Sequence, residues 1–279
     1  MGIKFRLIVM NFLQYAIWGS WLISLGAYLG GGLDFTGLQI GSFFATMGVA
    51  SLFMPAVMGI IADRWIPAQK LLGICHLVSG GFLIAAASQT AYGPLYSCML
   101  LSVMFYMPTI ALSNSVAYNA LDLARLDTVK HFPPIRVWGT VGFIAAMWFV
   151  DLTHIGGMQI KLTEWQLYVS AVLSFLLAVY SFSLPGCPVD RTVKARSWVD
   201  TLGLRAFTLF KEKRMAIFFV FSMLLGAALQ ITNAFGDSYI QSFGSMPQYA
   251  DSAIVKHSVI LLSLSQMSET FCILLIPFF

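Results

Sequence analysis

The sequence contains very little charge. Only 10% of its 279 residues are Asp, Glu, Lys or Arg, whereas 58% are hydrophobic and the mean hydropathy is +0.81. This scarcity excludes an ordinary soluble globular protein, because one soluble core cannot hide so much apolar surface from water. The composition therefore predicts that lipid is the main solvent of the chain.

Motifs of catalysis and metal binding are also missing. The four cysteines, Cys75, Cys98, Cys187 and Cys272, stand singly, with no C-x-x-C pair and no metal-like spacing, and are expected to be packing residues. The four histidines lie far apart, and no H-E-x-x-H, G-x-S-x-G or G-x-x-x-x-G-K-[ST] string is present. We therefore expect no cofactor, no metal, no enzymatic activity, no ATP-driven pump and no nucleic-acid partner.

Long apolar runs fill most of the chain. A helix needs roughly 20 apolar residues to cross a bilayer, whereas a barrel strand needs only ~9 to 11. The fifth run is the shortest, and Pro133 and Pro134 suggest that its helix begins before the apolar stretch. The eight runs that predict membrane-spanning helices are Leu7–Leu29, Leu38–Ala62, Leu71–Ser88, Leu95–Ala117, Val137–Leu152, Trp165–Leu184, Met215–Phe235 and Ile254–Phe279.

The basic residues between these runs predict the orientation. Cytoplasmic loops of membrane proteins hold the excess of Lys and Arg. If the gaps alternate sides from a cytoplasmic N-terminus, one side collects 13 basic residues and the other only Lys161 and Lys256, with Arg136 left at the edge of the fifth helix. We therefore expect a multi-pass membrane protein with its N-terminus in the cytoplasm.

The gaps also predict the domain organisation: a six-helix N-terminal bundle over 1–184, a cytoplasmic linker over 185–214 and a partial C-terminal bundle over 215–279. Six helices, a basic linker and two further helices suggest a duplicated transporter cut short after its eighth helix.

The linker has a helical pattern of its own. Trp198, Leu202, Ala206 and Leu209 recur at helical spacing among basic residues, which is typical of an amphipathic helix at the membrane surface. A basic loop held there only by topology is the alternative.

Glu269 is a carboxylate within the last apolar run, and by hydropathy it is the only acid at mid-membrane depth. An ionised carboxylate in hydrocarbon costs at least ~2.5 to 3.5 kcal/mol, so such a residue usually faces a cavity, a partner or a substrate path. Glu269 is therefore a candidate functional residue.

A loop motif follows the second run. Gly59, Asp63 and Arg64 lie in the string Gly59-Ile60-Ile61-Ala62-Asp63-Arg64-Trp65, where a small Gly permits close helix approach and Asp63 can pair with a basic group or cap a helix. Such contacts predict a cytoplasmic latch that holds one conformation; an ordinary charged turn is the alternative. The pattern resembles the G-x-x-x-D-R signature of the major facilitator superfamily, although Pro67 and Gln69 depart from it.

Further strings resemble the bacterial nucleoside:proton symporter family over nearly the whole chain. They include Trp18-Gly19-Ser20-Trp21, Tyr106-Met107-Pro108-Thr109, Phe132-Pro133-Pro134-Ile135-Arg136-Val137-Trp138-Gly139-Thr140 and Leu229-Gln230-Ile231-Thr232-Asn233. The resemblance implies an all-α major facilitator fold of twelve helices, of which the last four would be missing here. It also implies a protein of the lipid bilayer of a bacterial inner membrane, expected to be a monomer, that binds nucleosides such as uridine or adenosine together with protons.

Polar residues on the last two runs form two pairs. Gln230 and Asn233 stand at i, i+3, as do Gln266 and Glu269, so each pair projects from one helical face. Amides offer a donor and an acceptor, which suits ribose hydroxyls and base edges. From spacing alone, substrate contact and hydrogen bonding between helices are equally good explanations. The family resemblance favours substrate contact.

On the fifth helix, Arg136, Thr140 and Phe143 share a face at i, i+4 and i+7. Phe143 can stack on a base and Thr140 supplies a hydroxyl, while an arginine snorkelling to the interface is the alternative for Arg136. The resemblance implies that all three line the substrate cavity. On the first helix, core packing and substrate lining remain equally good explanations of a further polar stripe, Asn11, Gln14 and Trp18.

Arg136 and Glu269 would come from different bundles. If they approach, the cation lowers the carboxylate pKa and desolvation raises it, so movement between bundles can couple a proton to substrate. A static ion pair is the alternative, and Glu269 can instead bind ribose hydroxyls. The sequence thus predicts nucleoside import by proton symport with alternating access. The alternatives are a sugar or drug porter of the same superfamily and a fragment unable to transport alone.

Overall fold

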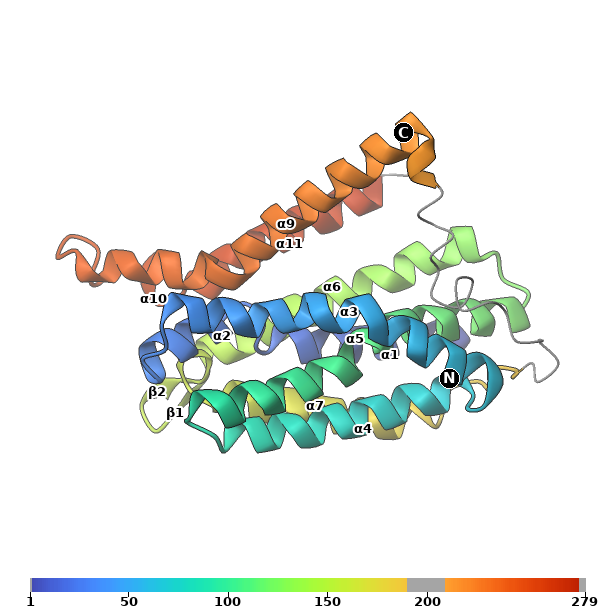
Figure 1. Cartoon of the computed structure of the whole chain (residues 1–279), viewed down its shortest axis with the longest axis horizontal. Helices are drawn as coiled ribbons and strands as arrows, with labels where there is room; N and C mark the ends of the chain where they lie inside the picture. The colour runs from blue at the N-terminus through green and yellow to red at the C-terminus, as the bar shows by residue number, and fades with distance from the viewer. Residues whose placement is uncertain (1, 190–208, 276–279) are drawn as a thin grey trace.

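We describe the protein from a computed structural model, which covers residues 2–189 and 209–275. The helices are long, apolar and antiparallel, and pack as a bundle (Figure 1). The elements are α1 (Ile3–Gly19), α2 (Leu25–Ala27), the π-helical turn η1 (Tyr28–Gly32), α3 (Gly37–Arg64), α4 (Ala68–Ala87), α5 (Tyr92–Leu123), α6 (Thr128–Leu152), β1 (His154–Ile155), β2 (Met158–Gln159), the 3-10 turn η2 (Ile160–Leu162), α7 (Trp165–Ser181), α9 (Lys213–Ser242), the 3-10 turn η4 (Phe243–Ser245), α10 (Ala253–Lys256) and α11 (Ser258–Leu275).

Each of the eight predicted spans contains a helix. Within the described residues, five helices are long and apolar enough to cross a membrane, namely α3, α4, α5, α6 and α9 with its 3-10 extension. The first span is interrupted by a turn at 20–24, and α7 has only 17 residues. Amide N–H groups bonded to carbonyls within the same helix satisfy the backbone where lipid offers no partner. The chain is therefore a polytopic all-α membrane protein.

Helix ends differ from the apolar runs where polar residues continue the helix. α6 begins at Thr128, capped by the Asp127 side chain, so Pro133 and Pro134 lie inside its first turns, as their position before the apolar run suggested. α9 continues beyond the predicted end at Phe235 to Ser242 and so takes in Asp237, which is completely buried. Hydropathy alone places this acid in a loop, whereas the fold makes it a buried carboxylate within a helix.

The first six spans share one core, which polar side chains tie together between helices. Gln14 on α1 donates to the Thr109 hydroxyl on α5 (2.7 Å) and its carbonyl oxygen lies 2.8 Å from His76 Nε2 on α4. Ser24 donates to Gln166 at 2.9 Å. Such bonds are the usual link between membrane helices, because lipid supplies no competing partner.

Two ends of the bundle need names. The hairpin end carries the antiparallel pair β1 and β2, in which His154 faces Gln159, and the motif end carries the last turns of α3, with Gly59 and Asp63. Helices α9 and α11 lie side by side, near the other helices at the hairpin end, and diverge from them toward the motif end (Figure 1). The only buried residues of α9 are accordingly Ala234 and Asp237, in its hairpin-end half.

The predicted bundle boundaries at 184 and 215 stay a prediction. The amphipathic helix predicted around Trp198, Leu202 and Ala206 lies outside the described residues; Leu209, at its predicted end, is exposed.

Candidate functional site

A cavity of about 180 Å³ lies between the first six spans and the last two helices. It receives side chains from α1, α6, α9 and α11, which are distant in sequence. All seven residues predicted to bind substrate line it. The complete lining is Tyr15, Trp18, Leu22, Arg136, Thr140, Phe143, Leu229, Gln230, Asn233, Gln266 and Glu269.

The α6 side of the cavity is set by close packing of α1 against α6. A Cβ built on Gly19 would lie 2.3 Å from the carbonyl oxygen of Phe143, and one on Gly142 would lie 2.2 Å from that of Phe12. Only glycine at both places allows the two backbones to approach so closely. This contact places Phe143 and the neighbouring Thr140, both nearly buried, at the cavity wall.

Arg136 lies over the ring of Tyr15, with its guanidinium carbon 3.9 Å from the ring centroid. This cation–π contact holds a half-buried cation that forms no ion pair with a carboxylate of the described residues. Arg136 lines the cavity, and its planar side chain is held by Tyr15, a lining residue that sequence reasoning missed. The i, i+3 spacing of Tyr15 and Trp18 was the signal that could have found this lining face of α1; Leu22 joins the lining from the turn that follows the helix.

The α9 and α11 side supplies amides and a carboxylate. Gln266 is 9% exposed, and Gln230 Nε2 is buried without a hydrogen-bond partner among the described residues. An unpaired buried amide costs about 1 to 3 kcal/mol, so a donor left open at a cavity wall is suited to a ligand that accepts. Glu269 is exposed, although it lines the same cavity.

Arg136 and Glu269 line one cavity but form no ion pair with each other among the described residues. The static pair considered from the sequence is absent from this conformation. The cation is held by an aromatic ring and the carboxylate is left free to accept hydrogen bonds.

For the polar stripe Asn11, Gln14 and Trp18 on α1, the sequence left core packing and substrate lining open, and the three residues differ in their surroundings. Asn11 donates to the Leu7 carbonyl at 2.9 Å and Gln14 bonds to α4 and α5, so both are buried packing residues. Trp18 instead lines the cavity, 6.5 Å edge-on from Phe143, and its indole N–H has no partner among the described residues.

Comparison with known proteins agrees with this arrangement. The model of a protein family described as nucleoside H+ symporter matches residues 1–279. The chain belongs to this family. The family consists of transporters rather than enzymes.

Individual relatives and solved structures are similar to this chain over nearly its whole length. The chain is 51% identical to the xanthosine permease of Escherichia coli K12 and 47% identical to the nucleoside permease NupG of the same organism, in each case over 100% of this chain and 66% of the relative. It thus spans just under two thirds of the length of these permeases. A crystal structure of the nucleoside transporter NupG matches with a TM-score of 0.87 and 46% identity, over all of this chain and 67% of that one. For a mutant of NupG the TM-score is 0.90, with coverage of 99% and 68%. The fold is that of the major facilitator transporters.

The loop motif of this family member lies open to solvent at the motif end. Asp63 is exposed at the end of α3, and neither it nor Arg64 forms a side-chain hydrogen bond or ion pair within the described residues. A Cβ at Gly59 would meet nothing within 4 Å, so the close helix approach expected there is absent in this conformation. The cytoplasmic latch therefore stays a prediction.

The cysteines match their expected role only in part. Cys75 and Cys187 are buried and Cys98 is half-buried, whereas Cys272 is exposed on α11. The expectation of packing residues thus fails for Cys272, because α11 has a free face in this structure.

Proposed function

We propose that this chain provides the substrate cavity of a proton-coupled nucleoside importer in a bacterial inner membrane, with the N-terminus and the motif end cytoplasmic, and that it acts as a monomer. The observation that carries the proposal is the meeting of Arg136, the aromatic Phe143, two amide-bearing helices and a carboxylate at one cavity. A ring to stack on a base, amides to bond its edge and a carboxylate to accept from ribose hydroxyls together match a nucleoside.

Divergence of α9 and α11 toward the motif end supports the cytoplasm as the side to which this conformation opens. Alternating access then requires the two groups of helices to separate at the hairpin end and approach at the motif end. In that second state Asp63 and Arg64 are the groups available to form the latch.

Glu269 has two candidate roles in this function. As a carboxylate it accepts hydrogen bonds from ribose, and as the acid of the cavity it is the first candidate for the coupled proton. A Glu269→Gln protein that still binds nucleoside but no longer responds to a proton gradient would assign the second role. Loss of binding would assign the first.

Uridine binding to the purified chain in lipid nanodiscs tests the site. We expect the Gln230→Ala and Glu269→Gln variants each to weaken binding about ten-fold or more, because a hydrogen bond to a charged or buried group contributes about 1.5 to 3 kcal/mol. The matched control is Ser265→Ala, since Ser265 is exposed on α11 and bonds only to its own helix. Unchanged binding in both variants, or displacement by sugars and not by nucleosides, would remove the assignment.

A further inference from the structure

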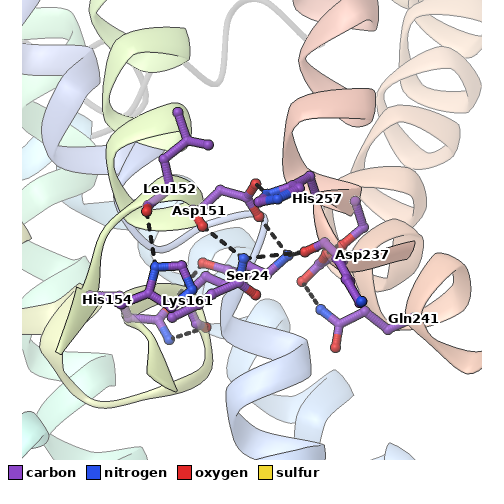
Figure 2. A network of polar contacts seen from close by, with 12 residues as sticks. Ser24, Asp151, Leu152, His154, Lys161, Asp237, Gln241 and His257 are labelled. Atoms are coloured by element: carbon purple, nitrogen blue, oxygen red, sulfur yellow. Dashed lines mark hydrogen bonds and ion pairs between the residues drawn. The ribbon is translucent and has the colours of Figure 1, made fainter. Parts of the chain in front are cut away.

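A second group of charged residues lies at the hairpin end, apart from the substrate cavity. Asp151 is in the last turn of α6, Lys161 is in η2, Asp237 is on α9, and His257 separates α10 from α11. Figure 2 shows these side chains converging from the two groups of helices. Asp151, Lys161 and Asp237 are at most 1% exposed. Buried charges in a membrane protein are costly and commonly mark a functional site.

The contacts join the first six spans to the last two helices. Lys161 Nζ lies 2.5 Å from Asp151 Oδ1 and donates to the Lys256 carbonyl at 2.8 Å and to the Ser258 hydroxyl at 3.2 Å, so all three of its N–H groups are used. His257 Nδ1 lies 2.7 Å from Asp151 Oδ2. The contacts of Lys161 with Lys256 and Ser258, and of Asp151 with His257, join the two groups of helices and would break if the helices separated at this end, whereas the Lys161–Asp151 pair lies within the first six spans.

Asp237 completes the group from the α9 side. Its Oδ1 accepts a hydrogen bond from Ser258, and its Oδ2 accepts one from Gln241 at 2.9 Å. Ser258 therefore links Lys161 to Asp237. We call Asp151, Lys161, Asp237 and His257 the hairpin-end cluster.

The cluster lacks one proton for neutrality. Two carboxylates and one ammonium carry a net charge of −1 when the imidazole of His257 is neutral. An uncompensated charge at a buried interface costs several kcal/mol, whereas one added proton makes the cluster neutral. His257 is the entry point, because its side chain is 36% exposed whereas the other three members are buried.

Other charged or titratable groups nearby do not supply the positive charge that would neutralise the cluster. Lys256 points to Asp251 at 3.0 Å on the surface, which neutralises both. His154 of β1 is exposed and bonds the Leu152 carbonyl at 3.1 Å. Water screens these groups, so the buried balance depends on the cluster itself.

We propose that the hairpin-end cluster is a proton-binding site that closes this end of the transporter: one proton taken from the aqueous phase on that side holds the two groups of helices together. Binding and closure are linked, because separation removes Asp151 from His257 and exposes both carboxylates to water, where no proton is needed. The site rests on the proposed function only for its place in the transport cycle. In the expected orientation, external protons favour the state open to the cytoplasm.

Distance measurements between spin labels test the proposal without any nucleoside. The labels replace Met158 of β2 and Tyr249 after α9, both exposed, in the full chain with its four native cysteines changed to Ser. We expect the ratio of closed to separated protein to fall about five-fold or more as the pH rises from about 5 to 9. A ratio that does not change with pH would overturn the proposal.

Charge-changing variants make the test specific. In His257→Gln the amide still bonds Asp151 but takes no proton, so the closed state is depleted at every pH. In Asp237→Asn the cluster is neutral without a proton, so the protein stays closed at high pH, where the wild type separates. Combining the two substitutions restores closure, because the buried charges again cancel. The control His154→Gln keeps the wild-type profile, since His154 lies outside the cluster.

The results separate this site from the nucleoside function. Wild-type pH profiles in both His257→Gln and Asp237→Asn would refute the cluster as the proton site, whatever the protein binds. The predicted profiles combined with no uridine binding would retain the proton site and refute nucleoside recognition.

Discussion

The contact of α1 with α6 gives the most direct test of the packing. We expect Gly142→Ala to destabilise the protein, because the new Cβ would lie 2.2 Å from the carbonyl oxygen of Phe12. An ordinary contact begins near 3.4 Å, so the two helices must separate by about 1 Å. The clashing atom is backbone and cannot rotate away as a flexible side chain would.

Two effects of opposite sign decide how much Gly142→Ala changes the unfolding free energy. Overpacking a core costs about 1 to 3 kcal/mol, and a clash with backbone belongs at the upper end. Replacing Gly by Ala inside a helix stabilises it by about 1 kcal/mol. The cost of the clash is larger than the gain in helix propensity, so the unfolding free energy falls by about 2 kcal/mol. For a chain of this size, that lowers Tm by roughly 4 to 8 °C.

Thermal unfolding of the purified protein in detergent, followed by tryptophan fluorescence, measures the effect. The matched control is Gly81→Ala in α4, where a Cβ meets nothing within 4 Å and only the gain in helix propensity remains. Its Tm is expected to equal or exceed that of the wild type. The double variant Gly19→Ala with Gly142→Ala should lose less than the sum of the two, because one separation relieves both clashes. A Gly142→Ala protein as stable as the Gly81→Ala control would refute the close approach.

Two further predictions concern polar groups in the first bundle and after it. Gln14→Leu removes the hydrogen bond to His76 Nε2, and His76 Nδ1 already lacks a partner among the described residues. We therefore expect the unfolding free energy, measured by thermal unfolding, to fall by about 1 to 3 kcal/mol. The double variant with His76→Phe should lose less than the sum of the two single losses, and full additivity would contradict the pairing. Cys187 lies beyond α7, where burial raises the pKa of its thiol while the backbone hydrogen bond to Gln69 lowers it. A raised pKa means less thiolate at a given pH, so with the other cysteines changed to Ser, maleimide should label the folded protein more slowly than the protein unfolded in SDS at about pH 7.5; equal rates would show that the thiol is accessible.

The helices were predictable because a bilayer imposes one requirement on each of them. Every span must be apolar over its whole length and must satisfy its own backbone. The apolar runs therefore locate the helices, and the predicted bounds fail where polar residues continue a helix or where a turn interrupts an apolar run, as at 20–24. Asp237 is such a case: hydropathy ends the helix at Phe235, but Gln241 and Ser258 satisfy the carboxylate and the helix continues to Ser242.

The candidate site was predictable in its residue types and only partly in its contacts. Helical spacing groups Arg136 with Thr140 and Phe143, and the family resemblance places them at a cavity. Helical spacing does not predict which residues of another helix a side chain contacts. The sequence left open whether Arg136 approaches Glu269, and in the structure Arg136 lies on the ring of Tyr15.

The sequence by itself determined that lipid is the main solvent of the chain, the positions and order of its apolar spans, the family and the residue types at the cavity, because these depend on composition, period and local motifs. Tertiary structure alone decided which faces meet. It made Gln14 a link between three helices and Trp18 a cavity wall, although both belong to one stripe of α1. It also gathered Asp151, Lys161, Asp237 and His257 from four segments into one buried cluster, because the energy of a charge depends on its neighbours in space.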